Sequence, residues 1–272
     1  MRILHTSDLH VGRTLGNLSL LEDQAAVLDQ IADIASQEKV DVVVIAGDIY
    51  DRAVPSAEAV ALVDRFLVRL VVHDKRKVLA IAGNHDRAAT GGLSTSNFNP
   101  AAKRAAQWTT DQLDGRAHTY LERLRETEVA GVDDDFTIVH GSPSNPLWAY
   151  TTHPEDALDC LFTIATPHCI VGHTHSPSLF EREPGAGGKT FKPDLPLMLP
   201  FVAGEVVPMN RGSRYVVNPG SVGQPRDGDP RAAYVLYERH GPDLQTLQLR
   251  RVRYDIGEVQ ARMRAHGLPD VL

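Results

Sequence analysis

The sequence has little cysteine, no long apolar run and no excess of positive charge, and each of these features excludes a class of protein. Only two of the 272 residues are cysteine, Cys160 and Cys169, which excludes a disulfide framework and a zinc site built from thiolates. No run approaches the roughly 18 apolar residues that a membrane span needs, and the N-terminus lacks an apolar signal region. We therefore expect a cytoplasmic protein that has no membrane partner.

Charge and composition narrow the class further. The net charge of −7, from 35 acidic and 28 basic side chains, argues against a protein that coats nucleic acid, although it is compatible with a local basic groove. A hydrophobic share of 42% and a charged share of 23% are typical of a globular chain. We interpret residues 1–272 as a single domain, with a proline- and glycine-rich excursion at about residues 181–212 that forms hairpins or irregular structure.

Short β-branched runs alternate with amphipathic helical patterns along the chain. Residues 41–46 indicate a buried strand because their apolar side chains follow one another without alternation, whereas residues 21–38 have apolar side chains at helical spacing. The expected strands are residues 2–6, 41–46, 77–82, 136–139, 168–171, 215–217, 233–238 and 247–254. The expected helices are residues 21–38, 57–72, 101–113, 116–125, 155–164 and 258–265. This order predicts an α/β fold with helices on both faces of a sheet.

Polar side chains follow five of the expected strands, at the point where each strand ends. They are Asp8 and His10, then Asp48, then Asn84, then His140, and finally His173 and His175. Because the carboxyl ends of strands in an open α/β sheet share one edge, we expect these side chains to converge on one crevice. The pattern therefore predicts a single site.

The seven side chains at this site offer carboxylate or amide oxygens and imidazole nitrogens, which are too many ligands for one tetrahedral ion. Without thiolates, the set fits two borderline divalent metals such as manganese, iron or zinc, and we expect manganese. Two cations held about 3.5–4 Å apart need a bridging anion, and Asp48 is the natural bridge because its strand is expected to be central. The glycines before Asp48, Asn84 and His173 suit sharp turns from strand to loop.

Each motif alone has an ordinary explanation, because Asp-x-His is a common surface pair and Gly-Asp-x-x-Asp is often a capped loop. Histidines set close together between glycines seldom serve packing, and the motifs occur together in one order. That order is Asp8-x-His10, Gly47-Asp48-x-x-Asp51, Gly83-Asn84-His85-Asp86, His140-Gly141 and Gly172-His173-x-His175. The set resembles the motifs of the calcineurin-like metallophosphoesterase superfamily.

This resemblance implies a four-layer αββα sandwich of two mixed β-sheets flanked by helices, with two metals at the sheet edge. It implies that one metal is held by Asp8, His10, Asp48 and His175. The other metal would be held by Asp48, Asn84, His140 and His173.

Two parts of the chain are similar to different relatives within that superfamily. Residues 1 to about 86 resemble the nuclease subunit of the SbcCD-type DNA repair complex, in residues 5–14 and 47–56. From residue 83 onward the chain resembles the small stand-alone bacterial phosphoesterases, in residues 88–91, 140–143 and 218–228. The two resemblances therefore imply the same metal chemistry but different substrates.

Three functions follow from these resemblances. The leading one is a two-metal phosphodiesterase that acts on a small nucleotide or dinucleotide. The alternative is an SbcD-like DNA nuclease subunit whose partners are DNA and an SMC-like ATPase. A third is a non-catalytic scaffold, like the retromer subunit of this fold, although every expected metal ligand is present here.

For the enzyme, we expect the two metals to lower the pKa of a bridging water, so that hydroxide attacks phosphorus in line. We assign His85 to charge stabilisation or to protonation of the leaving oxygen, with Asp86 orienting its imidazole. The alternative is that His85 is a loop residue that contacts Asp51.

Residues 218–228 form a second candidate element. Their glycines, with Asn218, Ser221 and Arg226, could present backbone N–H groups and a guanidinium to a phosphate. The alternative is a tight turn that joins two strands. Asp51, Asn218, Ser221 and Arg226 are therefore candidates for supporting the metal ligands or for binding substrate.

Overall fold

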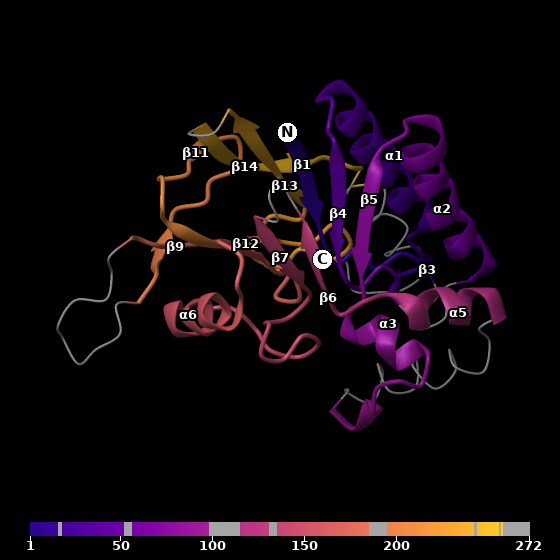
Figure 1. The fold of residues 1–272 in the computed structure, drawn as a ribbon. Coiled ribbons are helices and arrows are strands. Elements are labelled where there is room, and N and C mark those ends of the chain that lie inside the picture. The colour runs from indigo at the N-terminus through magenta and orange to yellow at the C-terminus, as the bar shows by residue number, and fades with distance from the viewer. Residues whose placement is uncertain are drawn as a thin grey trace.

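The computed structural model contains two six-stranded sheets stacked face to face, with helices on the outside (Figure 1). It describes residues 1–15, 18–51, 56–97, 115–130, 135–184, 195–241, 244–255 and 257. The helices expected at residues 101–113 and 258–265 lie outside the described residues. Within the described part of the chain, no helix is both long enough and apolar enough to cross a membrane.

The first sheet has the strand order β11-β14-β13-β1-β4-β5. Its strands are β1 (Arg2–Thr6), β4 (Val42–Ala46), β5 (Lys77–Ile81), β11 (Val206–Pro208), β13 (Ala232–His240) and β14 (Leu244–Val252). Strands β1, β4 and β5 run parallel to one another, whereas β13, β14 and β11 pair antiparallel. The sheet is therefore mixed, and β4 lies in its interior between β1 and β5.

The second sheet has the strand order β10-β9-β12-β8-β7-β6. Its strands are β6 (Thr127–Ala130), β7 (Phe136–Val139), β8 (His168–Ile170), β9 (Pro177–Arg182), β10 (Leu197–Leu199) and β12 (Arg214–Pro219). Strands β7, β8 and β12 run parallel, and the outer strands pair antiparallel. A separate two-stranded ribbon is formed by β2 (Thr14–Leu15) and β3 (Leu18–Ser19).

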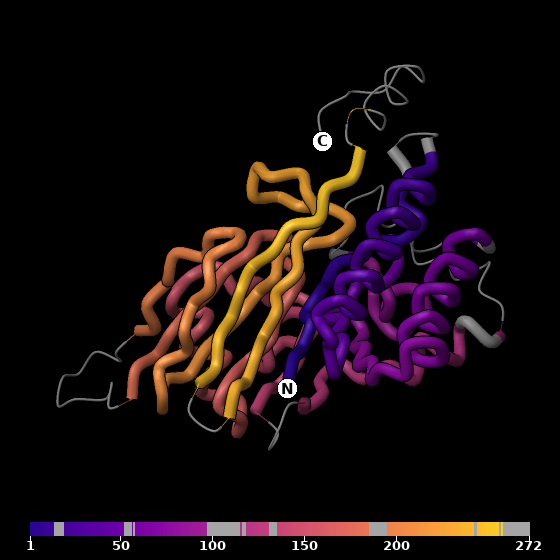
Figure 2. The backbone as a smooth tube through the Cα atoms, turned by 90° about the horizontal axis from the view of Figure 1, so that it is seen from above, coloured from indigo at the N-terminus to yellow at the C-terminus, as the bar shows by residue number. Residues whose placement is uncertain are grey.

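Helices cover the outer face of each sheet. They are α1 (Leu21–Gln37), α2 (Ala57–Val68) with a π-helical turn η1 (Arg69–His73), α3 (Asn84–Ala89), a 3₁₀ turn η2 (Thr95–Asn97), α5 (Gly115–Arg123) and α6 (Pro154–Thr163). Figure 2 shows the indigo and purple helices of the first half of the chain gathered beside the first sheet, away from the orange strands. Helix α6 lies against the second sheet, where Cys160 packs in one cluster with Cys169 and Phe180.

Strand β4 explains how the layers form. All its side chains are apolar, and they alternate between two cores: Val43 and Ile45 pack toward the helices, whereas Val44 and Ala46 pack toward the second sheet. A strand that is buried on both faces has a continuous apolar run for this reason. Helices, first sheet, second sheet and α6 therefore make four layers, which confirms the predicted αββα sandwich of mixed sheets.

The excursion expected at about residues 181–212 contributes, where it is described, edge strands to both sheets. Strand β10 pairs antiparallel with β9, and β11 pairs antiparallel with β14 of the other sheet. Each of these two edge strands has only three residues, too few to produce a period in the sequence. The eight strands that were expected from apolar runs are all present, within a few residues at each end.

Candidate metal centre

The polar residues that follow the strand ends come together as two buried triads. The first triad is Asp8, His10 and His175, and the second triad is Asp48, His140 and His173. Within each triad the ligand atoms lie within 4.8 Å of one another. Both triads combine a loop of the first sheet, after β1 or β4, with loops of the second sheet, after β7 or β8. The sequence argument assumed a single sheet edge, whereas the site joins the edges of two stacked sheets.

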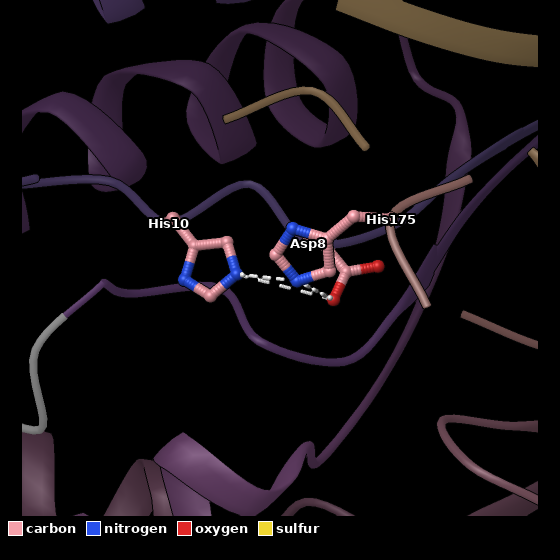
Figure 3. A group of neighbouring side chains, drawn as sticks. All are labelled: Asp8, His10 and His175. Carbon is pink, nitrogen blue, oxygen red and sulfur yellow. Dashed lines mark hydrogen bonds and ion pairs between the residues drawn. The ribbon is translucent and has the colours of Figure 1, made fainter. Parts of the chain in front are cut away.

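In the first triad the three side chains point toward one another (Figure 3). Nε2 of His175 lies 3.2 Å from Oδ1 of Asp8 and 3.2 Å from Nε2 of His10. The other carboxylate oxygen of Asp8 accepts the hydroxyl hydrogen of Ser7 at 2.7 Å and the backbone N–H of His173 at 3.1 Å. Because Oδ2 is held in this way, Oδ1 is directed at the two imidazoles.

In the second triad, Nε2 of His140 lies 3.3 Å from Oδ2 of Asp48. Nδ1 of His140 lies 2.8 Å from the carbonyl oxygen of Ala46 and donates a hydrogen to it, so Nε2 is the nitrogen that faces Asp48. Asp48 also connects the triads, since its Oδ2 is 4.0 Å from Nε2 of His10 and its Oδ1 accepts the backbone N–H of His85 at 3.1 Å. Asp48 therefore lies between the two triads, and its role as a bridging ligand stays a prediction.

Several polar atoms at the site are buried and have no hydrogen-bond partner among the described residues. Two of them, Oδ1 of Asn84 and Nε2 of His173, also lack an ion-pair partner there. Unpaired buried acceptors of this kind cost about 1–3 kcal/mol each unless something satisfies them. A cation would satisfy both atoms, so they fit the predicted metals.

The spacing and charge of the donors agree with this fit. Two imidazole nitrogens on one tetrahedral ion, each at 2.0–2.1 Å, lie about 3.4 Å apart, close to the 3.2 Å between His10 and His175. Burial opposes ionisation of Asp48, but His140 and other histidines outweigh burial and hold its pKa well below its usual range. Buried carboxylates of this kind need a compensating positive charge.

The histidines differ in their protonation. Burial lowers the pKa of His173 to about 4, so this ring is neutral at pH 7, as a metal ligand must be. Burial also opposes the charged form of His140, but the carboxylates of Asp48 and Asp8 outweigh burial and raise its pKa to about 10. A metal bound at the second triad would compete with this proton.

The backbone at the site is left-handed at five of the seven predicted ligands. They are Asp8 (φ 51°), His10 (45°), Asp48 (50°), His173 (67°) and His175 (59°). Elsewhere in the described residues only Lys39 and Lys75 share this conformation among non-glycine residues. Side chains other than glycine rarely adopt it, and such strain is concentrated at functional sites. The conformation therefore singles out five of the six triad residues as a candidate functional site, independently of their residue types.

The glycines that precede the ligands serve two different purposes. Gly47 has a φ of +86°, as predicted for a sharp turn. Gly83 has an ordinary extended backbone, but a Cβ there would lie 2.0 Å from Oδ1 of Asp48. Gly172 also lacks a positive φ, and a Cβ there would lie 2.9 Å from Cβ of Ser7. At these two positions close packing, and not conformational freedom, requires glycine.

The structure places His85 and Asp86 differently from each other. His85 is half-buried, and its ring lies edge-on to that of His10 with centroids 5.5 Å apart. Asp86 is buried, and its Oδ2 accepts the backbone N–H groups of Gly83 at 2.9 Å and Ile49 at 3.4 Å, at the start of α3. This geometry does not match the predicted orientation of the His85 imidazole by Asp86, because adjacent helical residues do not face each other.

The remaining predicted residues support the ligand loops. Asp51 Oδ1 lies 3.4 Å from Nδ1 of His10 and 3.3 Å from the guanidinium of Arg13. Ser221 is buried, and its hydroxyl donates to the carbonyl oxygen of Asp8 at 2.9 Å. Asn218 is also buried and donates to the carbonyl oxygen of Gly172 at 2.7 Å. Asn218 and Ser221 therefore lie behind the ligands, in a position to hold them and not to contact substrate.

Arg226 and three residues that sequence reasoning missed complete the surroundings. Arg226 is exposed, and its backbone N–H donates to the carbonyl oxygen of His175 at 3.1 Å. Ser7 lies in the stretch that carries the resemblance, but the sequence analysis gave it no role. Gln24 of α1 donates to the carbonyl oxygen of His10 at 2.6 Å. Tyr150 stacks on His173, and no motif in the sequence indicates it.

Comparison with known proteins agrees with this fold. Residues 1–241 match the sequence model of the calcineurin-like phosphoesterase superfamily domain. The crystal structure of a metallophosphoesterase from Sphaerobacter thermophilus is similar, with 36% sequence identity, a TM-score of 0.66, and coverage of 99% of this chain and 96% of that one. A hypothetical protein from Pyrococcus horikoshii OT3 shares the fold, with 15% identity, a TM-score of 0.65, and coverage of 98% and 94% of the two chains.

Proposed function

Because this chain belongs to the calcineurin-like phosphoesterase superfamily, a family of metal-dependent hydrolases, we propose that it is a two-metal phosphodiesterase acting on a small nucleotide or dinucleotide. The observation that carries the proposal is the pair of buried triads joined by Asp48. The preference for a small nucleotide rests on the resemblance of residues 83 onward to stand-alone phosphoesterases. The net charge of −7, which repels polyanionic DNA, also supports it. We propose a cytoplasmic location for the same enzyme, as expected from the sequence.

The first triad would hold one metal and the second triad the other, with Asn84 added to the second and Asp48 shared between them. Two divalent ions supply Lewis-acid charge and a water of lowered pKa when they are bound. We propose manganese, because carboxylate, amide and imidazole donors without thiolate suit it.

The chain's own residues prepare the site for these ions. Nδ1 of His140 and Nδ1 of His175 lie 2.8 Å and 2.7 Å from backbone carbonyl oxygens, and the hydrogens they donate there fix which nitrogen faces the metals. His85 remains our candidate for neutralising or protonating the leaving oxygen, because it is half-buried beside His10. No role is proposed for Asp86 beyond capping α3 and holding the backbone of Ile49.

The substitution Asp48→Asn tests the proposed function. We expect the manganese-loaded protein to hydrolyse bis(p-nitrophenyl) phosphate, and the variant to lose about 100-fold or more in turnover together with bound manganese, because ligand shells typically carry effects of this size. Asp41→Asn is the matched control, since Asp41 is exposed directly before β4, at the end opposite Asp48, and its side chain accepts the backbone N–H of Arg2. We expect this control to keep its metal and its turnover.

A panel of nucleotides, dinucleotides and end-labelled duplex DNA then identifies the substrate. We expect the protein to hydrolyse the small nucleotides and to leave the DNA intact. Release of nucleotides from DNA, abolished by Asp48→Asn, would favour the SbcD-like nuclease function instead. A protein that binds two manganese ions but hydrolyses no phosphoester would contradict the enzymatic proposal and favour the scaffold.

A further inference from the structure

Tyr150 lies flat against a predicted metal ligand. Its ring and the imidazole of His173 have centroids 4.4 Å apart and planes inclined by 9°, so that one face of the tyrosine is covered by the histidine. The tyrosine is nevertheless 52% exposed. A large aromatic side chain that is half-exposed beside a buried site presents its uncovered face outward.

The loop that carries Tyr150 is anchored on both sides of it. The loop begins at His140, and it folds back so closely that a Cβ on Gly141 would lie 2.9 Å from the carbonyl oxygen of Ala149. On the other side, Thr151 is buried, and its hydroxyl lies 3.5 Å from Sγ of Cys160 in α6. The backbone on either side of Tyr150 is therefore held, and its exposed ring is fixed in position.

The orientation of the ring leaves the metal site open. A histidine binds a metal in the plane of its imidazole, and the tyrosine ring is parallel to that plane and displaced from it. The buried Nε2 of His173 therefore stays accessible to a metal. A third ring that stacked on the outer face of Tyr150 would be parallel to both the tyrosine and the imidazole of His173. It would lie about 8 Å from the imidazole plane, which is roughly two stacking distances. A sugar and phosphate can span a separation of this size between a base and the metal site.

We propose that Tyr150 is a specificity-determining residue, whose outer face stacks on the nucleobase of the phosphoester bound at the two triads. The inference rests on the proposed function and adds the reason why the substrate would be a nucleotide. Every nucleobase has a flat π-face, so stacking selects for nucleotides without selecting strongly among the four bases. The alternative is that Tyr150 only positions His173.

Binding of two matched probes to the manganese-loaded protein tests the proposal. Adenosine 5′-monophosphate and ribose 5-phosphate share the phosphate and the sugar and differ in the base. We expect adenosine 5′-monophosphate to bind more tightly by on the order of tenfold, as measured by calorimetry. Tyr150→Leu should abolish this preference and leave the affinity for ribose 5-phosphate and the manganese content unchanged, whereas Tyr150→Phe should keep the preference.

Phe162→Leu is the matched control, because Phe162 is an aromatic side chain of α6 that is 64% exposed and contacts Arg182 instead of the site. An unchanged preference in Tyr150→Leu would overturn the stacking role. An equal loss of affinity for both probes, together with lost manganese, would overturn it in favour of positioning His173. If the unmodified protein binds neither probe and hydrolyses no phosphodiester, the proposed function itself is wrong.

Discussion

Replacing Gly83 with alanine tests the position of Asp48 with a single methyl group. Gly83 has φ −96° and ψ −179°, a conformation that alanine adopts freely, so the backbone does not resist the change. The new Cβ would lie 2.0 Å from Oδ1 of Asp48, whereas ordinary contact begins at 3.4 Å. The Cβ would also lie 2.5 Å from the backbone nitrogen of Asp48, so the carboxylate must move by about 1.4 Å and the loop that carries it must shift as well. Either movement also breaks the hydrogen bond from the backbone N–H of His85 to Asp48.

The expected consequence is a large loss of function with a modest loss of stability. A displacement of 1 Å at reacting groups costs about 100-fold in rate, and overpacking a core position costs about 1–3 kcal/mol of unfolding free energy. Turnover of bis(p-nitrophenyl) phosphate, calorimetric titration with manganese and urea unfolding measure the three effects. Gly115→Ala is the control, because Gly115 is exposed at the start of α5 and a Cβ there meets nothing within 4 Å. Full turnover and full manganese binding in Gly83→Ala would refute the assignment of Asp48 as the shared ligand.

Two further predictions concern stability and the support of the ligands. Burial lowers the pKa of His168 to about 4 from its ordinary 6.5, so the unfolded chain binds the extra proton first as the pH falls. Through this residue the unfolding free energy should therefore fall by about 3 kcal/mol between pH 6.5 and pH 4. Urea unfolding at several pH values should show a smaller dependence of the unfolding free energy on pH in His168→Gln than in the unmodified protein. The same pH dependence in both proteins would refute the prediction. Asn218→Ala removes hydrogen bonds to Gly172 and Thr174, which flank His173. We expect manganese affinity to fall about 10–100-fold, and calorimetry that finds wild-type affinity would show that Asn218 does not position the ligand.

The candidate ligands were predictable because strand ends and residue chemistry leave a local pattern. Strand β4 is a continuous apolar run that ends at Ala46, and Gly47 and Asp48 follow directly, so sequence alone places this carboxylate at a sheet edge. His173 and His175 were found in the same way after β8. Apolar runs and periodicity predicted the core strands and a sheet with helices on both faces, because each core strand and helix carries its own pattern. The four layers were implied by the family resemblance.

The parts that could not be predicted depend on contacts between distant segments. Tyr150 reaches His173 only because its loop folds back over Gly141, and nothing near residue 150 records this. The short strands β10 and β11 exist because longer neighbours offer them an edge. The hydrogen bonds of Asp86 to the backbone N–H groups of Gly83 and Ile49 also join separate segments, and the sequence does not record them.

The left-handed backbone at five ligands explains how this fold holds the site. Each such residue costs roughly 1–2 kcal/mol, which the loops offset by bonding to one another. The backbone N–H of Asp8 donates to Gly47, that of His10 to Asp48, and that of Gly172 to the carbonyl oxygen of His140. Every strained loop is thus held by a neighbouring loop whose strand is buried in the apolar layers beneath. The ligands are therefore positioned by the packing of two sheets, and the metals would bind to a site that the chain has already formed.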